Sequence, residues 1–79
     1  MPRFFFHLAD PASELKDEEG MDLPDAEAAW FQAVRSAREL IRADLCLGSS
    51  WQGRRVCIED EQGLPVQQVP FEEVASYVV

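Results

Sequence analysis

One amphipathic segment, residues 25–47, constrains the fold of this 79-residue chain more than any other feature. Asp25 is a good N-cap residue, because its carboxylate can accept hydrogen bonds from the free amides of a first helical turn. No Gly or Pro then interrupts the chain until Gly48, which fits the position just after a helix C-terminus. Apolar residues recur at helical spacing in between, at positions 26, 29, 30, 33, 34, 37, 40, 41 and 45. The spacing predicts one long helix with a single buried stripe.

The residues of this stripe predict how the helix packs. Alanines at 26, 29, 33 and 37 allow a close approach to a sheet, and five larger side chains supply the apolar bulk: Trp30, Val34, Leu40, Ile41 and Leu45. Burial of each large side chain contributes roughly 1.5–3 kcal/mol. A chain this short buries only about 60% of its unfolded surface. We therefore expect nearly every apolar residue to serve the core or an interface.

The opening segment, residues 3–8, is predicted to be a strand by its aromatic content and by its end at Asp10. Alternation places Phe4, Phe6 and Leu8 on the face towards the helix. Phe5 and His7 then lie on the opposite face, which carries an aromatic ring as well. Both faces of this strand therefore need cover.

The remaining elements complete a simple order. Residues 21–23 are predicted as a short strand, and residues 55–59 and 64–69 as a hairpin, with Pro65 favouring an edge position for the last strand. Residues 71–75 are expected to form a helical turn ahead of a loosely attached tail, and Trp51 to fold over the core edge. The order β-β-α-β-β predicts one α+β domain over residues 1–79, in which a long helix packs on one face of a mostly antiparallel sheet of three to four strands.

Charge and composition exclude several functions. The chain has 15 acidic and 7 basic residues and a net charge of −8, which opposes binding to a phosphate backbone or an anionic membrane. No apolar run is long enough to span a membrane, and no export signal opens the chain, so we expect a cytoplasmic protein. Its two cysteines, Cys46 and Cys57, are then expected to be free thiols. One His and two Cys cannot complete an ordinary four-ligand zinc site, so we expect no structural metal site. We expect no cofactor either.

The chain resembles a family of short, uncharacterised bacterial proteins, mostly alphaproteobacterial, that is classed as a domain of unknown function. The resemblance covers nearly the whole chain and rests on five segments: MPRFFFH at 1–7, DEEG with LPD at 17–25, AVRSAREL at 33–40, VCIEDEQG at 56–63 and VPF at 69–71. It implies a stand-alone small domain. It implies no activity, cofactor or catalytic residue.

An uncovered sheet face is the preferred basis for a function. One helix covers one face only, which leaves the other to Phe5, His7, Cys57 and one or both of Val69 and Phe71. A contiguous apolar patch on so small a protein usually marks an interface. We therefore expect a non-enzymatic interaction or regulatory module, most simply a homodimer, whose partner is a second copy or another protein. The alternative is that Trp51 and the C-terminal tail cover this face.

Two alternatives use particular side chains. His7 and Cys57 share strand parity, so adjacent strands would allow a thiolate–imidazolium pair in a small enzyme or redox protein. Phe31, Arg35, Arg38 and Arg42 follow one helix stripe and could bind an anionic ligand, RNA or an acidic patch on another subunit, such as the chain's own acidic loop in a symmetric dimer. The plainer interpretation of the stripe is a solvated face with an Arg35–Glu39 ion pair at i,i+4. Nucleic acid is the least favoured partner because of the net charge.

Overall fold

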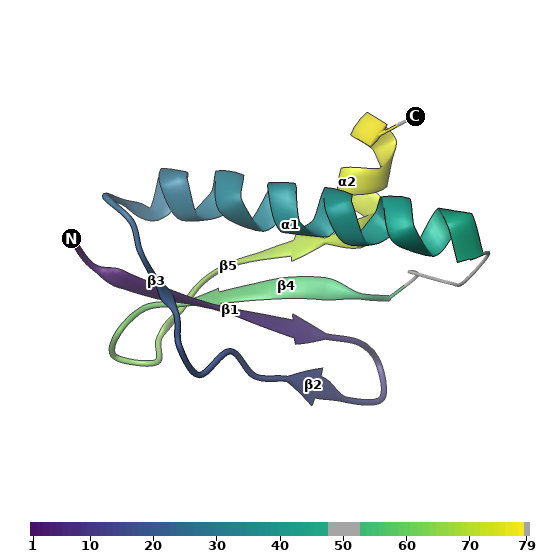
Figure 1. The fold of residues 1–79 in the computed structure, drawn as a ribbon. Helices are drawn as coiled ribbons and strands as arrows, with labels where there is room; N and C mark the ends of the chain where they lie inside the picture. The colour runs from purple at the N-terminus through teal and green to yellow at the C-terminus, as the bar shows by residue number, and fades with distance from the viewer. Residues whose placement is uncertain (48–52, 79) are drawn as a thin grey trace.

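The computed structural model describes residues 1–47 and 53–78 and shows a sheet with two helices on the same side (Figure 1). The elements follow the chain in this order: β1 (Arg3–Ala9), β2 (Glu14–Leu15), β3 (Met21–Asp22), α1 (Ala26–Leu47), β4 (Arg55–Glu59), β5 (Pro65–Pro70) and α2 (Phe71–Val78). The predicted two-layer α+β class and the long helix are confirmed.

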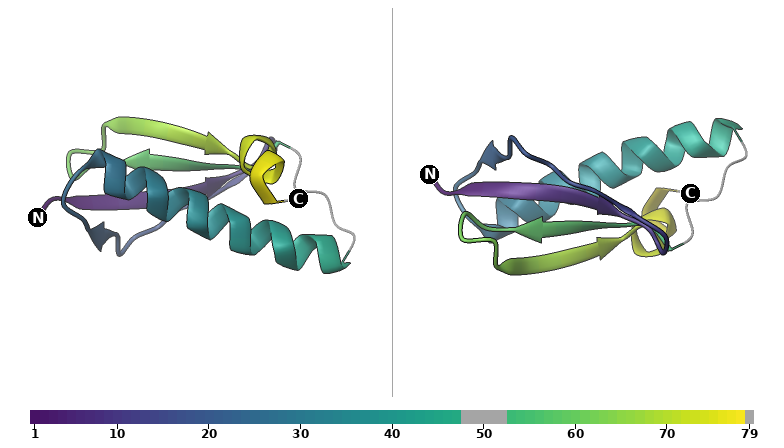
Figure 2. Two further views of the ribbon diagram at one scale, coloured as in Figure 1. Left: turned by 90° about the horizontal axis from the view of Figure 1, so that it is seen from above. Right: turned by 90° about the horizontal axis from the view of Figure 1, so that it is seen from below.

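The sheet is antiparallel throughout and is built around β1. Its order is β2-β1-β4-β5, and β3 also pairs with β1. β4 runs along one edge of β1, while β2 and β3 pair with its two ends at the other edge (Figure 2). As predicted from Pro65, β5 is the outer strand of this path. The short β2 was not predicted, because it lies in a polar segment and both of its residues are exposed.

Aspartates organise the turns between these strands. The Asp10 carboxylate accepts hydrogen bonds from the amides of Ala12 and Ser13, at 2.8 and 2.7 Å, and so turns β1 into β2. Asp60 does the same after β4, where it accepts from Gln62 and Leu64 at 2.9 and 3.0 Å. An Asp side chain that bonds to amides two to four residues later replaces the backbone pairing that a turn gives up.

Helix α1 begins at the predicted N-cap and buries three of the four predicted alanines, whereas Ala26 in its first turn is exposed. The carboxylate of Asp25 accepts a hydrogen bond from the amide of Ala28 at 2.9 Å, the geometry of an N-cap. Ala29, Ala33 and Ala37 are fully buried, and their small size allows the helix backbone to approach the sheet closely. The buried core also contains residues from β1, β4, β5 and α2: Phe4, Val56, Ile58, Val69, Phe71 and Val74.

Two expectations about the periphery were wrong. Leu40 is 40% exposed and does not fill the core, because it lies at the margin of the buried stripe, whereas its neighbour Ile41 is buried. Residues 71–78 form a helix that packs against α1, not a single turn with a loose tail. The predicted helix stop at Gly48 and the predicted position of Trp51 lie outside the described residues.

None of the helices in the described part of the chain is both long and apolar enough to cross a membrane.

Candidate functional site

The predicted aromatic–arginine stripe of α1 borders a hollow in the protein surface. The hollow has a volume of about 400 Å³ and is lined by Trp30, Phe31, Val34, Arg35 and Arg38; we call it the α1 hollow. Residues at i, i+4 and i+7 or i+8 come from successive turns and therefore share one side of the helix. Arg42 is exposed one turn further on but does not line the hollow.

The aromatic residues give the α1 hollow an apolar wall. Trp30 and Val34 are half-buried and pack against the core, so their positions are fixed from below. Phe31 is 59% exposed, and its ring meets that of Trp30 edge-to-face with centroids 5.0 Å apart and an angle of 77° between the planes. This is a preferred arrangement of two aromatic rings. The Phe31 ring thus extends the apolar wall outward from Trp30.

The two arginines that line the hollow have no partner among the residues that the structure describes. Neither Arg35 nor Arg38 makes an ion pair or hydrogen bond there. The Arg35–Glu39 ion pair expected at i,i+4 is not formed within 4.0 Å in that part of the chain. Two guanidinium groups therefore stand next to an apolar wall with their donors available. This combination can bind a carboxylate and an apolar group together.

The second predicted surface, the face of the sheet away from α1, is divided by the structure. We call it the far face. Phe5 and Cys57 are half-buried on it, whereas His7 is only 5% exposed. Val69 and Phe71 do not belong to it: both are core residues, 2% and 0% exposed.

Strand register and helix packing explain why Val69 and Phe71 lie in the core. Val69 lies opposite Val56 in the β4–β5 pair and therefore shares the helix-facing side. Phe71 is the first residue of α2 and is buried beneath that helix. The far face instead shows polar neighbours of Cys57 at the same parity, Arg55 and Glu59. The predicted continuous apolar patch is therefore absent from the described residues.

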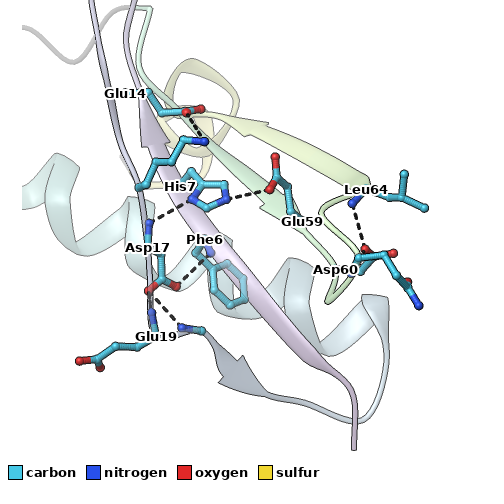
Figure 3. Close-up of polar contacts among 11 residues, drawn as sticks. Phe6, His7, Glu14, Asp17, Glu19, Glu59, Asp60 and Leu64 are labelled. Atoms are coloured by element: carbon cyan, nitrogen blue, oxygen red, sulfur yellow. Dashed lines mark hydrogen bonds and ion pairs between the residues drawn. The ribbon is translucent and has the colours of Figure 1, made fainter.

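The burial of His7 rests on hydrogen bonds to both of its ring nitrogens (Figure 3). The backbone N–H of Asp17 donates to Nδ1 at 3.0 Å, and Nε2 lies 3.0 Å from Oε1 of Glu59. Since Nδ1 accepts, the proton belongs on Nε2, which then donates to the carboxylate. The ring of Phe5 also lies nearly parallel to the imidazole, with centroids 6.5 Å apart. His7 thus fastens the loop before β3 to the far face.

Asp17 strengthens the same attachment with its side chain. Its carboxylate accepts three backbone hydrogen bonds, from Phe6 at 3.1 Å, Glu19 at 3.1 Å and Gly20 at 3.2 Å. Burial alone would raise the pKa of Asp17, but the amide hydrogen bonds from Phe6, Gly20 and Glu19, with the nearby His7, outweigh it and lower the pKa below its usual value. The acidic loop is therefore attached to β1 by the hydrogen bonds of Asp17, and this role of Asp17 is structural. Within the described residues, no three His, Cys, Asp or Glu side chains converge as metal ligands would.

The predicted neighbourhood of His7 and Cys57 is observed, but it does not make a catalytic pair. The two residues lie directly opposite each other in the β1–β4 register. Both imidazole nitrogens are already bonded to Asp17 and Glu59, so accepting a proton from the thiol would require His7 to give up the Asp17 amide. The geometry of the described chain gives Cys57 no available base.

Fold and site together define a small two-layer α+β domain with a cationic, partly aromatic hollow on its long helix. A family model described as a domain of unknown function (DUF6894) matches residues 3–72, so the chain belongs to that family. The match confirms the resemblance to a family without an assigned activity. Comparison with curated proteins and with solved structures gave no significant match.

The sequence predicts the exposed side of the α1 hollow but not the side that borders the core. Phe31, Arg35 and Arg38 were predicted as a contact stripe, whereas Trp30 and Val34 were assigned wholly to the core. The available signal was the Trp30–Phe31 pair, since consecutive aromatics on a helix straddle the boundary between buried and exposed sides. The role of Asp17 also had a signal, because an Asp three residues before a Gly is typical of a side-chain-capped turn.

Proposed function

We propose that this domain is a non-enzymatic protein-interaction module whose binding surface is the α1 hollow. One observation carries the proposal: two arginines without a partner in the described chain stand beside a fixed aromatic wall. Tryptophan and arginine are enriched among the residues that dominate binding energy at protein interfaces. A volume of about 400 Å³ also lies near the lower end of the range of ligand pockets in proteins.

The hollow combines a rigid base with adaptable ends. Trp30 and Val34 are held by the core, so a partner that contacts them meets a surface that is already organised. The guanidinium groups of Arg35 and Arg38 lie on long, exposed side chains that can adjust to the partner's acceptors. Preorganised apolar contact lowers the entropic cost of binding, and the charged groups add orientation.

Variant-dependent capture tests the location of the surface. The immobilised domain is exposed to lysate of cells that make this protein, and retained proteins are quantified for wild type, Arg35→Glu/Arg38→Glu and Arg42→Glu. We expect at least one protein that wild type and Arg42→Glu retain alike and that the double variant loses at least tenfold. All three substitutions are at exposed helix positions, and circular dichroism verifies folding. A set of retained proteins that the double variant leaves unchanged would contradict the proposal.

Self-association through the far face is a second form of an interaction function. Half-buried Phe5 and Cys57 support it, although the buried His7 and the polar Arg55 and Glu59 reduce the apolar area available. Sedimentation velocity at 10-fold increments of concentration tests it. A dimer that Phe5→Glu abolishes supports this form, and a monomer at all concentrations rejects it.

A further inference from the structure

We infer that the α1 hollow recognises an acidic peptide segment in which one apolar side chain is flanked by carboxylates. This inference rests on the proposed function and specifies the chemistry of the partner. The apolar side chain would lie against Trp30, Phe31 and Val34, and the carboxylates would meet Arg35 and Arg38. Each part of the hollow thus has its own chemical counterpart.

The arginines determine the charged part of the partner. A guanidinium presents its donors in a planar fork that matches the two oxygens of a carboxylate. Arg35 and Arg38 lie on adjacent turns of α1, and neither is engaged by a carboxylate in the described chain. Two separate carboxylates on one segment can therefore satisfy both.

The aromatic wall determines the apolar part. Phe31 is 59% exposed and Val34 half-buried, so a partner side chain can remove apolar surface of both from water. Burial of apolar surface contributes roughly 25 cal/mol per Å² before the costs of association. A single exposed ion pair contributes little, because water and salt screen it, and two ion pairs together contribute more. Affinity therefore requires both the apolar side chain and the carboxylates that flank it.

The overall charge excludes a long polyanion. The net charge of −8 repels nucleic acid, which carries a phosphate charge about every 1.7 Å of duplex. A short peptide brings only a few negative charges, placed where the local field of two arginines is favourable. A second copy of this chain is a poorer occupant, because two carboxylates of its acidic loop are already engaged, Asp17 by backbone amides and Asp22 by Arg3.

A fluorescence titration with defined peptides tests this chemistry. Trp51→Phe leaves Trp30, one of the residues lining the hollow, as the sole tryptophan of the chain. The probe is the capped peptide Gly-Ser-Glu-Glu-Leu-Glu-Glu-Ser-Gly. Control peptides replace every Glu by Gln, or the Leu by Ala, and further arms contain a ten-nucleotide oligo-dT and inorganic phosphate. We expect saturable binding of the acidic peptide and at least tenfold weaker binding in every control arm.

Matched protein variants test the location. Arg35→Gln/Arg38→Gln should weaken binding at least tenfold, and Phe31→Ala at least threefold. Arg42→Gln keeps the stripe but lies outside the hollow, and Leu64 has the same 59% exposure as Phe31, so Arg42→Gln and Leu64→Ala should change affinity less than twofold. Equal losses in Arg42→Gln or Leu64→Ala would overturn the inference.

Failure of the inference can be told from failure of the proposed function. If the Gln peptide, oligo-dT or phosphate binds as tightly as the acidic peptide, the partner chemistry is wrong. If no peptide binds while the double variant still loses captured proteins, the inference is overturned and the proposed function stands. If capture is also insensitive to the double variant, both are rejected.

Discussion

Replacing Asp17 by Ala should destabilise the domain far more than the neighbouring change Glu18→Ala. The Asp17 carboxylate holds three amides, those of Phe6, Glu19 and Gly20, whereas the Glu18 side chain makes no hydrogen bond or ion pair with the described residues. The two acids are adjacent and carry the same charge. Any difference in stability between the two variants therefore measures the amide hydrogen bonds of Asp17 and not the loss of a negative charge.

The geometry sets the expected size of the effect. The bonds from Phe6 and Gly20 are partly buried and the bond from Glu19 is exposed. If each partly buried bond contributes about 1–1.5 kcal/mol and the exposed one little, Asp17→Ala costs about 2–3 kcal/mol. A domain of 79 residues is stable by only about 4–12 kcal/mol. The loss corresponds to a fall in Tm of roughly 10–20 °C.

Urea denaturation followed by circular dichroism measures the difference directly. We expect Glu18→Ala to stay within about 0.5 kcal/mol of wild type, as exposed substitutions usually do. Asp17→Asn should be intermediate, because its one oxygen can replace Oδ1 for two amides while its NH₂ group faces the amide of Phe6. Equal free energies of unfolding for the Asp17→Ala and Glu18→Ala variants would refute this explanation of the loop.

The pH dependence of stability follows from the same carboxylate. Because the pKa of Asp17 is lowered from 3.8 on folding, its contribution is fully present above that value. It is lost as the pH falls through the lower pKa of the folded state. The difference in unfolding free energy between wild type and Asp17→Asn should therefore shrink as the pH falls below 3.8. Since Asp10 titrates equally in both proteins, it cancels.

Three further substitutions test the fold by thermal denaturation. Gly20→Ala should cost about 3 kcal/mol, because φ is +73° and a Cβ would lie 2.8 Å from Arg3 Cγ and 2.9 Å from the Phe4 carbonyl oxygen. Gly63→Ala should cost only about 1 kcal/mol, because its φ is similar, +79°, but no atom lies within 4 Å of the added Cβ. Ala33→Leu should cost about 1–3 kcal/mol or more, because Ala33 is fully buried where α1 approaches the sheet; an unchanged Tm would show that the helix is not closely packed there.

Local signals account for what the sequence predicted well. The N-cap at Asp25, the stripe of α1 and the facing of Phe4 and Phe6 depend on neighbours within a turn or on simple alternation. Such features are therefore determined by residues that are close in the sequence. The predicted position of β5 at the sheet edge also followed from one residue, Pro65, whose missing N–H is tolerated there.

The features that sequence could not give depend on distant contacts. His7 was expected on an exposed face, but it is buried because Asp17 and Glu59 reach its two nitrogens from separate elements. Phe71 was expected near that face, but α2 folds it into the core. In each case the pattern around the residue is compatible with both placements, and only the tertiary contact decides between them.

The α1 hollow lies between these two cases. The spacing of Phe31, Arg35 and Arg38 was sufficient to place them on one stripe. The positions of Trp30 and Val34 depend on how far the helix rolls on the sheet, and the rotation leaves both at the margin of the core. Charge patterning thus indicated a contact surface, and packing determined its shape.

An amide chemical-shift map of the ¹⁵N-labelled chain, recorded with the capped acidic peptide described above, tests most directly where the partner binds. We expect the perturbed amides to cluster in residues 30–38 of α1, with little change at Phe5 and Cys57. Perturbations centred on Phe5 and Cys57, with residues 30–38 unchanged, would contradict the assignment and would place the binding surface on the far face.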